Sequence, residues 1–210
     1  QLPDGSLVVL NAHSTLRFSS DWGKASERSV MLHGEAYFEV VPRMRQNSTE
    51  PLAFVVRTGD GEIRVVGTKF VVYERNFGTR VVVEEGSVKV NPVNAKAAQT
   101  LLAAGQLSEF RRGDTSVVTQ SAGSGFHTTW WREDWQLEGT TFAEVIRRLE
   151  ETYNVRVEVQ DEALLQRKLS GAVENRDLEI LIAALAKALR VDVSREGSVI
   201  KFGDSLDQEQ

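Results

Sequence analysis

Short runs of apolar residues, separated by glycines and turn-forming pairs, fill the first 118 positions of this 210-residue chain. None of these runs keeps a helical period. They read SLVVL, SVMLHGEAYFEVV, LAFVVRT, EIRVVGTKFVVYE, TRVVVEEGSVKV and QLSEFRR. Runs rich in β-branched and aromatic residues, with turn signals at this spacing, are typical of strands. We therefore expect an all-β domain of short antiparallel strands over residues 1–118, with a tight hairpin at Gly86.

After residue 135 the pattern changes to an alternation of helix and strand. TTFAEVIRRLEETYNVRVEVQ spaces its apolar residues first as a helix and then as a strand. Thr141 and Glu144 form a capping box that would start the helix. The same spacing returns in RDLEILIAALAKALRVDVSRE, where Leu178 takes the position of Phe142. Residues 130–210 are thus expected to form a small two-helix α+β module with an internal helix-strand repeat, so that the whole chain is mainly β plus α+β.

A segment rich in Ser, Gly and Thr separates the two patterns. Residues 119–129 are predicted to be a linker. Trp130, Trp131 and Trp135 follow it, and we interpret them as anchors that dock one domain on the other, the alternative being a platform for a ligand. The side chains expected to lie in hydrophobic cores are Phe54, Val65, Phe70, Val83, Phe142, Leu149, Leu181 and Leu185.

Composition narrows the classes of function. The formal net charge is −5, and no basic stripe with interleaved aromatic residues is present, so nucleic acid is not an expected partner. The chain has no cysteine, which excludes disulfides and thiolate chemistry. The apolar run ILIAALA is far shorter than the roughly 20 residues of a membrane-spanning helix. Because the chain begins at Gln1, as if within a strand pair, we interpret it as part of a longer protein.

Two carboxylates in GEAYFEV, Glu35 and Glu39, are candidates for a catalytic pair. On one strand they would lie about 13 Å apart, whereas glycosidase pairs lie roughly 5 to 9.5 Å apart. The alternation instead predicts a strand buried on one side, with Ala36 and Phe38 inward and Glu35 and Tyr37 outward. An enzymatic alternative stays open, namely a carbohydrate-acting β-domain in which a neighbouring strand completes a site with Glu35 and Tyr37.

Other candidate chemistry is sparse. His13, His33 and His127 are scattered, and although Glu35 lies two residues from His33, two ligands do not make a metal site. We predict no metal and no cofactor.

The dipeptide Gly67-Thr68 interrupts what reads as one long strand. A threonine hydroxyl can attack the preceding carbonyl where a flexible glycine lets the peptide bond distort, which would cleave the chain there. The alternative is that the glycine marks a bulge or a close backbone approach.

Six segments in order resemble the periplasmic domain of FecR-type anti-sigma regulators. They are LPDGSLVVLNAHSTLRF, RSVMLHGEAYFEV, AFVVRT, VVGTKFVVY, VVVEEGSVKV and LLAAGQ. The second half, with FAEVIRRLEETYNVRVEV and KLSGAVENRDLEILIAALAKALRVDV, is similar to the secretin-and-TonB short N-terminal module.

This resemblance implies a regulator without enzymatic activity. It implies the periplasmic part of a single-span inner-membrane protein whose cytoplasmic end binds an extracytoplasmic-function sigma factor. The periplasmic part would receive its signal from the N-terminal signalling domain of a TonB-dependent outer-membrane receptor, typically one for an iron carrier. Some members of the family are processed at a Gly-Thr bond, which Gly67 and Thr68 match.

The last strand is our candidate for partner binding. It contains Val199, Ile200, Lys201 and Phe202 and is followed by a polar tail that supplies no further strand. We therefore expect an open sheet edge there. Two alternatives are that this strand pairs on both sides inside its own sheet, or that Lys201 serves to discourage edge pairing.

Overall fold

The computed structural model describes residues 1–19, 22, 27–75, 78–93, 99–114, 117–122, 125–128 and 130–205. The chain divides into two compact units, Gln1–Ala122 and Gly123–Gln210, here called the N-terminal and the C-terminal unit. The division falls inside the segment that the sequence predicts to be a linker. That segment carries most of strand β12 (Val118–Ser121) and a 3₁₀ turn, η1 (Gly125–His127).

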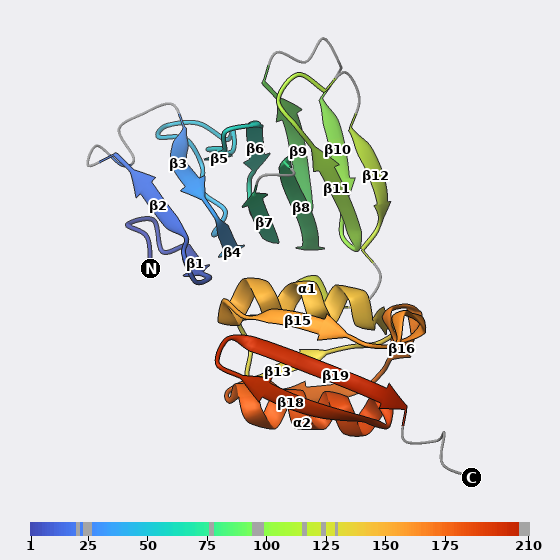
Figure 1. Ribbon diagram of the computed structural model, residues 1–210. Coiled ribbons are helices and arrows are strands. Elements are labelled where there is room, and N and C mark those ends of the chain that lie inside the picture. Colours follow the sequence, from blue (N-terminus) through green and yellow to red (C-terminus); the bar gives the residue numbers. More distant parts are fainter. Residues whose placement is uncertain are drawn as a thin grey trace. The chain divides into compact units, whose positions relative to one another are not determined.

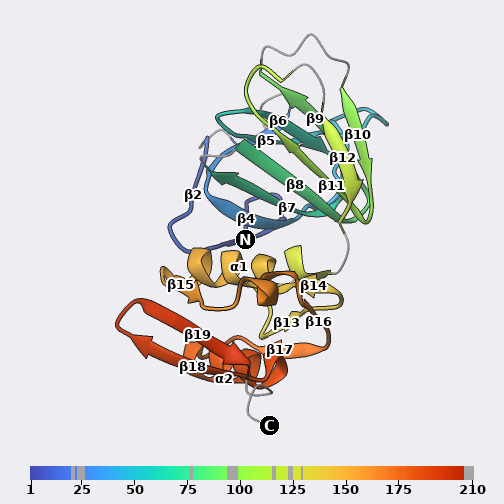
Figure 2. The same ribbon diagram turned by 45° about the vertical axis from the view of Figure 1, so that its right-hand side comes forward.

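The N-terminal unit consists of two six-stranded sheets that pack face to face (Figure 2). Sheet A has the order β1 (Leu7–Leu10), β4 (Glu35–Glu39), β7 (Lys69–Arg75), β8 (Gly78–Glu85), β11 (Gln106–Phe110) and β12. Sheet B has the order β10 (Thr100–Ala103), β9 (Ser87–Pro92), β6 (Gly61–Val65), β5 (Phe54–Arg57), β3 (Arg28–His33) and β2 (Thr15–Phe18).

The predicted antiparallel pairing holds with one exception. Strands β3 and β5 pair in parallel. The reason is that β4, which lies between them along the chain, belongs to the opposite sheet.

Inward-facing residues of both sheets form a single hydrophobic core. All four side chains predicted to be buried in this half, Phe54, Val65, Phe70 and Val83, are at most 3% exposed, which confirms the strand phase. Phe38 of sheet A stacks on Phe70, with 5.1 Å between the ring centroids.

The hairpin predicted at Gly86 is wrong. Strands β8 and β9 do not pair, because β8 belongs to sheet A and β9 to sheet B. Gly86, with φ of +89°, turns the chain from one sheet to the other. Gly86 thus has the positive φ that suggested a hairpin, but this conformation lets the chain pass from one sheet of the sandwich to the other.

The C-terminal unit has two helices, α1 (Phe142–Tyr153) and α2 (Leu178–Leu189), each followed by a strand (Figure 1). Its largest sheet has the order β15 (Arg156–Val159), β19 (Val199–Ser205) and β18 (Val191–Glu196). Two short pairs join β13 (Asp134–Gln136) to β17 (Ala172–Glu174) and β14 (Thr140–Thr141) to β16 (Lys168–Leu169), and η2 spans Glu162–Gln166.

The repeat read in the sequence corresponds to α1 with β15 and to α2 with β18, and the fold class is confirmed. Thr141 and Glu144 form the predicted capping box at the start of α1. Phe142, Leu149, Leu181 and Leu185 are completely buried in the core of this unit, as expected.

We predict that Phe70→Ala lowers the free energy of unfolding by about 3 to 5 kcal/mol, because it leaves a cavity between the sheets. Leu101→Ala is the matched control, since Leu101 is 61% exposed on the edge strand β10. It should change stability by no more than about 0.5 kcal/mol. Urea denaturation followed by circular dichroism measures both. A loss below about 1 kcal/mol for Phe70→Ala would mean that the ring does not hold the two sheets together.

Candidate functional sites

The acidic strand β4 is buried on both faces. Ala36 and Phe38 point into the core as predicted, but the expectation that the opposite face is solvated is wrong, since Glu35 is 0% and Tyr37 2% exposed. The Glu35 carboxylate accepts a hydrogen bond of 2.7 Å from Asn11 Nδ2. The Tyr37 hydroxyl donates to Glu84 Oε2 at 3.1 Å.

These contacts describe a structural role for Glu35. Its backbone also holds the turn after β1, because Asn11 N donates to Glu35 O at 3.0 Å and Glu35 N donates to Ser14 Oγ at 2.8 Å. Buried polar groups are normally hydrogen-bonded, and the bond between the Glu35 carboxylate and the Asn11 amide holds the turn after β1 against β4. The alternation of apolar and polar residues did not predict this burial, because it indicates on which face of the strand a residue lies and not whether another segment covers that face.

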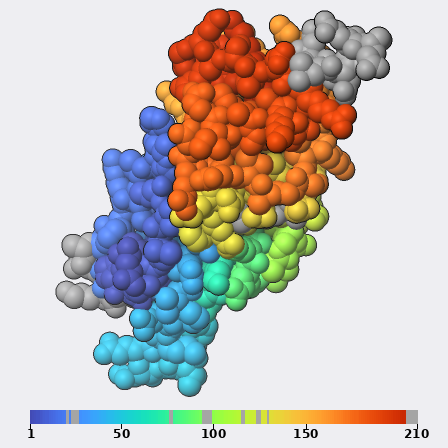
Figure 3. All heavy atoms as spheres, turned by 90° about the horizontal axis from the view of Figure 1, so that it is seen from below, coloured from blue at the N-terminus to red at the C-terminus, as the bar shows by residue number. Residues whose placement is uncertain are grey.

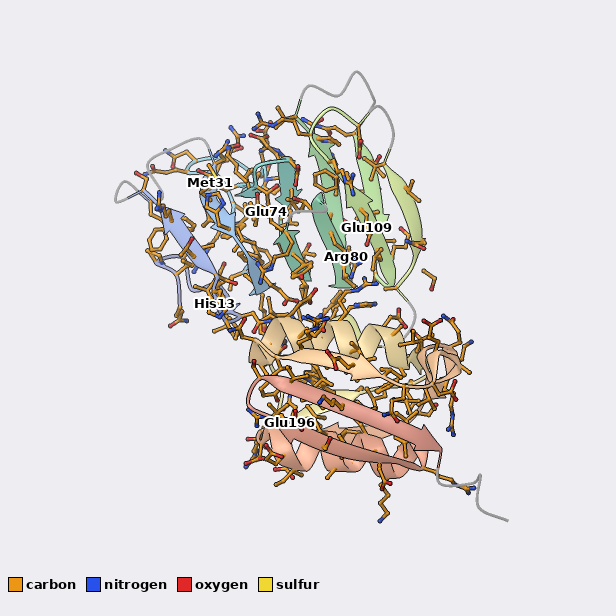
Figure 4. The ribbon with its side chains drawn as sticks, in the orientation of Figure 1. His13, Met31, Glu74, Arg80, Glu109 and Glu196 are labelled. Atoms are coloured by element: carbon orange, nitrogen blue, oxygen red, sulfur yellow. The ribbon has the colours of Figure 1, made fainter. Side chains whose placement is uncertain are left out.

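The histidines do not gather. His33 Nδ1 lies 3.2 Å from Glu74 Oε2, and Glu74 Oε1 accepts a hydrogen bond from Gly59 N. Figure 4 shows His13 and Glu74 in different parts of the N-terminal unit. Within the described residues, no three His, Asp or Glu side chains are grouped so as to hold a metal ion.

Gly67 and Thr68 do not interrupt one strand, as the sequence suggests, but connect β6 in sheet B to β7 in sheet A. Thr68 is 5% exposed, its hydroxyl donates to Ser87 O at 2.9 Å, and its carbonyl accepts from Val40 N at 3.0 Å. A Cβ added to Gly67 would lie 2.4 Å from Pro42 Cγ. The glycine is thus required by a close approach, and the second crossing lies alongside, since a Cβ on Gly86 would be 3.0 Å from Gly67 O.

A buried arginine holds this region. Arg28 is 2% exposed, and its Nη1 lies 2.6 Å from Asp4 Oδ2. The same guanidinium donates to the carbonyls of Val41 and Leu52 at 2.8 Å each and of Val66 at 3.3 Å. One side chain therefore joins the N-terminal turn, the loop after β4 and the residue just before Gly67. This role could not be predicted from the sequence, because an arginine at the start of a strand is ordinarily expected to be exposed to solvent.

The interpretation of Trp135 as a docking anchor between domains is wrong. It is completely buried in the core of the C-terminal unit, where its ring meets that of Phe126 at 5.5 Å and 88°. Trp130 accepts a hydrogen bond from Asn175 Nδ2 on its carbonyl at 3.2 Å. The guanidinium of Arg132 lies over the Trp131 ring at 5.4 Å. Of the three tryptophans, Trp135 therefore belongs to the core of its own unit.

The premise for the partner-binding strand is also wrong. Strand β19, which carries Val199, Ile200, Lys201 and Phe202, is the central strand of its sheet, parallel to β15 and antiparallel to β18. Ile200 and Phe202 are completely buried, and Phe202 packs edge-on against Phe142 at 5.0 Å. The hydrogen bond and the charge of Glu196 raise the pKa of Lys201 above its ordinary value. In the part of the chain that the structure describes, the outer strands of this sheet are therefore β15 and β18.

Comparison with known proteins matches each half of the chain to one family. Residues 1–89 match the family described as FecR protein, and residues 134–202 match the one described as FecR, C-terminal. Two crystal structures of a proposed anti-sigma factor from Parabacteroides distasonis ATCC 8503 have a TM-score of 0.70 each. They are 24% and 23% identical to this chain, cover 96% and 97% of it, and are themselves covered over 91% and 92% of their length. The search of curated proteins found no match.

The two matches together cover most of the chain, and the fold is shared with both crystal structures over nearly its whole length. The chain belongs to the FecR family, and its two units correspond in order to the two parts of that family. None of the helices in the described residues is long and apolar enough to span a membrane.

We predict that Asp4→Ala lowers the free energy of unfolding by about 3 to 5 kcal/mol, because it leaves the Arg28 guanidinium buried without its counter-charge. Glu50→Ala serves as the control, since Glu50 pairs with Arg45 at 3.8 Å with its side chain 74% exposed. A surface pair of this kind contributes about 0 to 1 kcal/mol. Equal small losses in denaturation experiments on both variants would contradict the role assigned to the buried pair.

Proposed function

We propose that this chain is the periplasmic signalling region of a FecR-type anti-sigma factor. It receives a signal from a TonB-dependent outer-membrane receptor and passes it, through a membrane span and a cytoplasmic segment of the whole protein, to an extracytoplasmic-function sigma factor. Iron-carrier uptake is the process that this relay would control. The observation that supports the proposal best is the ordered presence of both FecR parts on one chain, each with its own core.

The contacts of the described residues agree with a binding role. The acidic strand β4 was the reason for considering an enzyme. Its Glu35 and Tyr37 side chains are hydrogen-bonded to Asn11 and Glu84 of the same unit. In the described residues of the C-terminal unit, in contrast, the largest sheet has three strands, and an open strand edge is a surface to which another protein can add. We therefore assign receptor binding to the C-terminal unit.

We predict that the chain of residues 1–210 binds the N-terminal signalling domain of a TonB-dependent receptor from the same organism. The measurement is biolayer interferometry of the purified chain against a panel of these domains, each produced separately. One domain should bind saturably at a ratio of one to one. The receptor barrels without their N-terminal domains are the control. If no domain of the panel bound, the proposed relay would be wrong.

A second proposal is self-cleavage between Gly67 and Thr68. The observation that favours it is that the peptide groups on either side of this bond are held, by Arg28 on the Val66 carbonyl and by Val40 on the Thr68 carbonyl. The Thr68 hydroxyl would attack the Gly67 carbonyl carbon, the C–N bond would break to leave an ester and a free amine, and water would hydrolyse the ester. The hydroxyl must first leave Ser87 O, to which it donates.

We predict a cleavage product that begins at Thr68 when the purified chain is incubated and analysed by mass spectrometry. Thr68→Ala, which removes the nucleophile, should stay intact, and Thr68→Ser should still cleave. Wild-type protein that remained a single chain after prolonged incubation would rule out unassisted cleavage at this bond.

A further inference from the structure

The three-stranded sheet of the C-terminal unit has two outer strands, β15 and β18, on either side of β19 (Figure 1). Each outer strand has a row of backbone groups directed away from β19. The hydrogen-bond register decides which residues these are, and the side chains around them decide which edge is open.

On β15 the outward edge is closed by a side chain. Arg156 N donates to Ser198 O at 2.8 Å and Gln160 N donates to Phe202 O at 3.1 Å. Residues alternate along a strand, so Val157 and Val159 direct their backbone groups outward. The Val157 N–H is bonded to Glu150 Oε1 of α1 at 2.9 Å. A carboxylate therefore occupies a donor that an incoming strand would need.

On β18 the outward groups belong to Val193 and Arg195. Because Ser198 and Phe202 of β19 face β15, Val199 and Lys201 face β18, where they stand opposite Glu196 and Ser194. Ser194 and Glu196 thus exchange hydrogen bonds with β19, and the residues between them direct theirs away. In the part of the chain that the structure describes, no further strand pairs with this edge.

The side chains of β18 favour a second protein over a second copy. Asp192, Ser194 and Glu196 are exposed and lie on the face away from the helices, since Val191 and Val193 pack against the core. Figure 4 shows Glu196 near the end of the strand, and Figure 3 shows that the orange-red to red segments of this unit form part of the surface seen from below. Antiparallel self-pairing about Ser194 would place Asp192 of one copy opposite Glu196 of the other, and like charges directly opposite are destabilising.

We infer that the outer edge of β18 receives an extended segment of the receptor's signalling domain as a fourth strand, bonded to Val193 and Arg195. The segment carries a lysine or arginine on the side of Asp192, since Glu196 already pairs with Lys201 at 3.0 Å. Glu150 excludes the same addition at β15. This inference rests on the proposed function and assigns the partner to one edge.

Hydrogen exchange of the wild-type chain tests the assignment without any substitution. The probe is the receptor domain that binds in the panel described above. On addition of the domain, the amides of Val193 and Arg195 should exchange at least about tenfold more slowly, as expected for newly formed backbone hydrogen bonds, while the amide of Val159 is unchanged. Binding without protection at Val193 and Arg195 overturns the inference and leaves the proposed function standing. If no domain binds the wild-type chain, both fail.

A matched pair of proline variants gives the second test. Val193→Pro and Val159→Pro each remove one outward N–H, a substitution that edge strands tolerate. Val193→Pro should weaken binding about tenfold or more, and Val159→Pro should leave the affinity unchanged. The opposite order would place the partner on β15. Circular dichroism checks that both variants fold.

Asp192→Lys supplies a variant that keeps the backbone intact if Val193→Pro does not fold. It should weaken binding and reduce the salt dependence of the affinity, because it repels a basic partner strand. Unchanged affinity would overturn the charge assignment. Slower exchange at Val193 and Arg195 at high concentrations of the chain alone would show that a second copy occupies the edge, which would also overturn the inference.

Discussion

The N-terminal unit depends on one buried guanidinium. A sandwich of two sheets needs chain segments that cross between the layers, and a backbone that leaves its ladder loses its hydrogen-bond partners there. Arg28 supplies donors to three such carbonyls, those of Val41, Leu52 and Val66, and Asp4 balances its charge. The crossing at Gly67-Thr68 is adjacent to the last of these carbonyls. The side chain that joins these crossing segments therefore also holds the peptide group next to the candidate cleavage bond.

The two units use their polar groups differently. In the N-terminal unit, polar side chains of β4 form hydrogen bonds within the unit, Glu35 with Asn11 and Tyr37 with Glu84. In the C-terminal unit, the small sheet presents backbone groups at its edges, and an acidic side chain closes one edge but not the other. The proposed relay would use both properties, namely a part held by internal hydrogen bonds and a part whose sheet a partner can extend.

Hydrophobic periodicity correctly predicted the features that depend on the local spacing of residues, namely buried positions, a helix start and the helix-strand repeat. Phe70, Phe142 and Leu181 are buried, and the capping box at Thr141 and the helix-strand repeat are present. It failed where the answer depends on which strands become neighbours. Gly86 was expected in a hairpin, yet β8 and β9 join opposite sheets, and β19 was expected at an edge, yet it inserts between β15 and β18. Turn chemistry and alternation describe a strand and its ends, whereas the choice of partner follows from packing between segments far apart in the sequence.

The insertion of β19 itself has a physical cause that bears on binding. Ile200 and Phe202 are completely buried, so the strand that carries them is most stable where it has neighbours on both sides and the helices above its inner face. The strands left at the edges are those with fewer apolar side chains, and β18 ends in Ser194, Arg195 and Glu196. Charged edge strands resist indiscriminate pairing, and they admit only a strand whose charges match. Strand addition there would form a small number of backbone hydrogen bonds, each with a net contribution of about 1 kcal/mol. Such a contact would be specific through its charges and weak enough to be reversed, as the proposed relay requires.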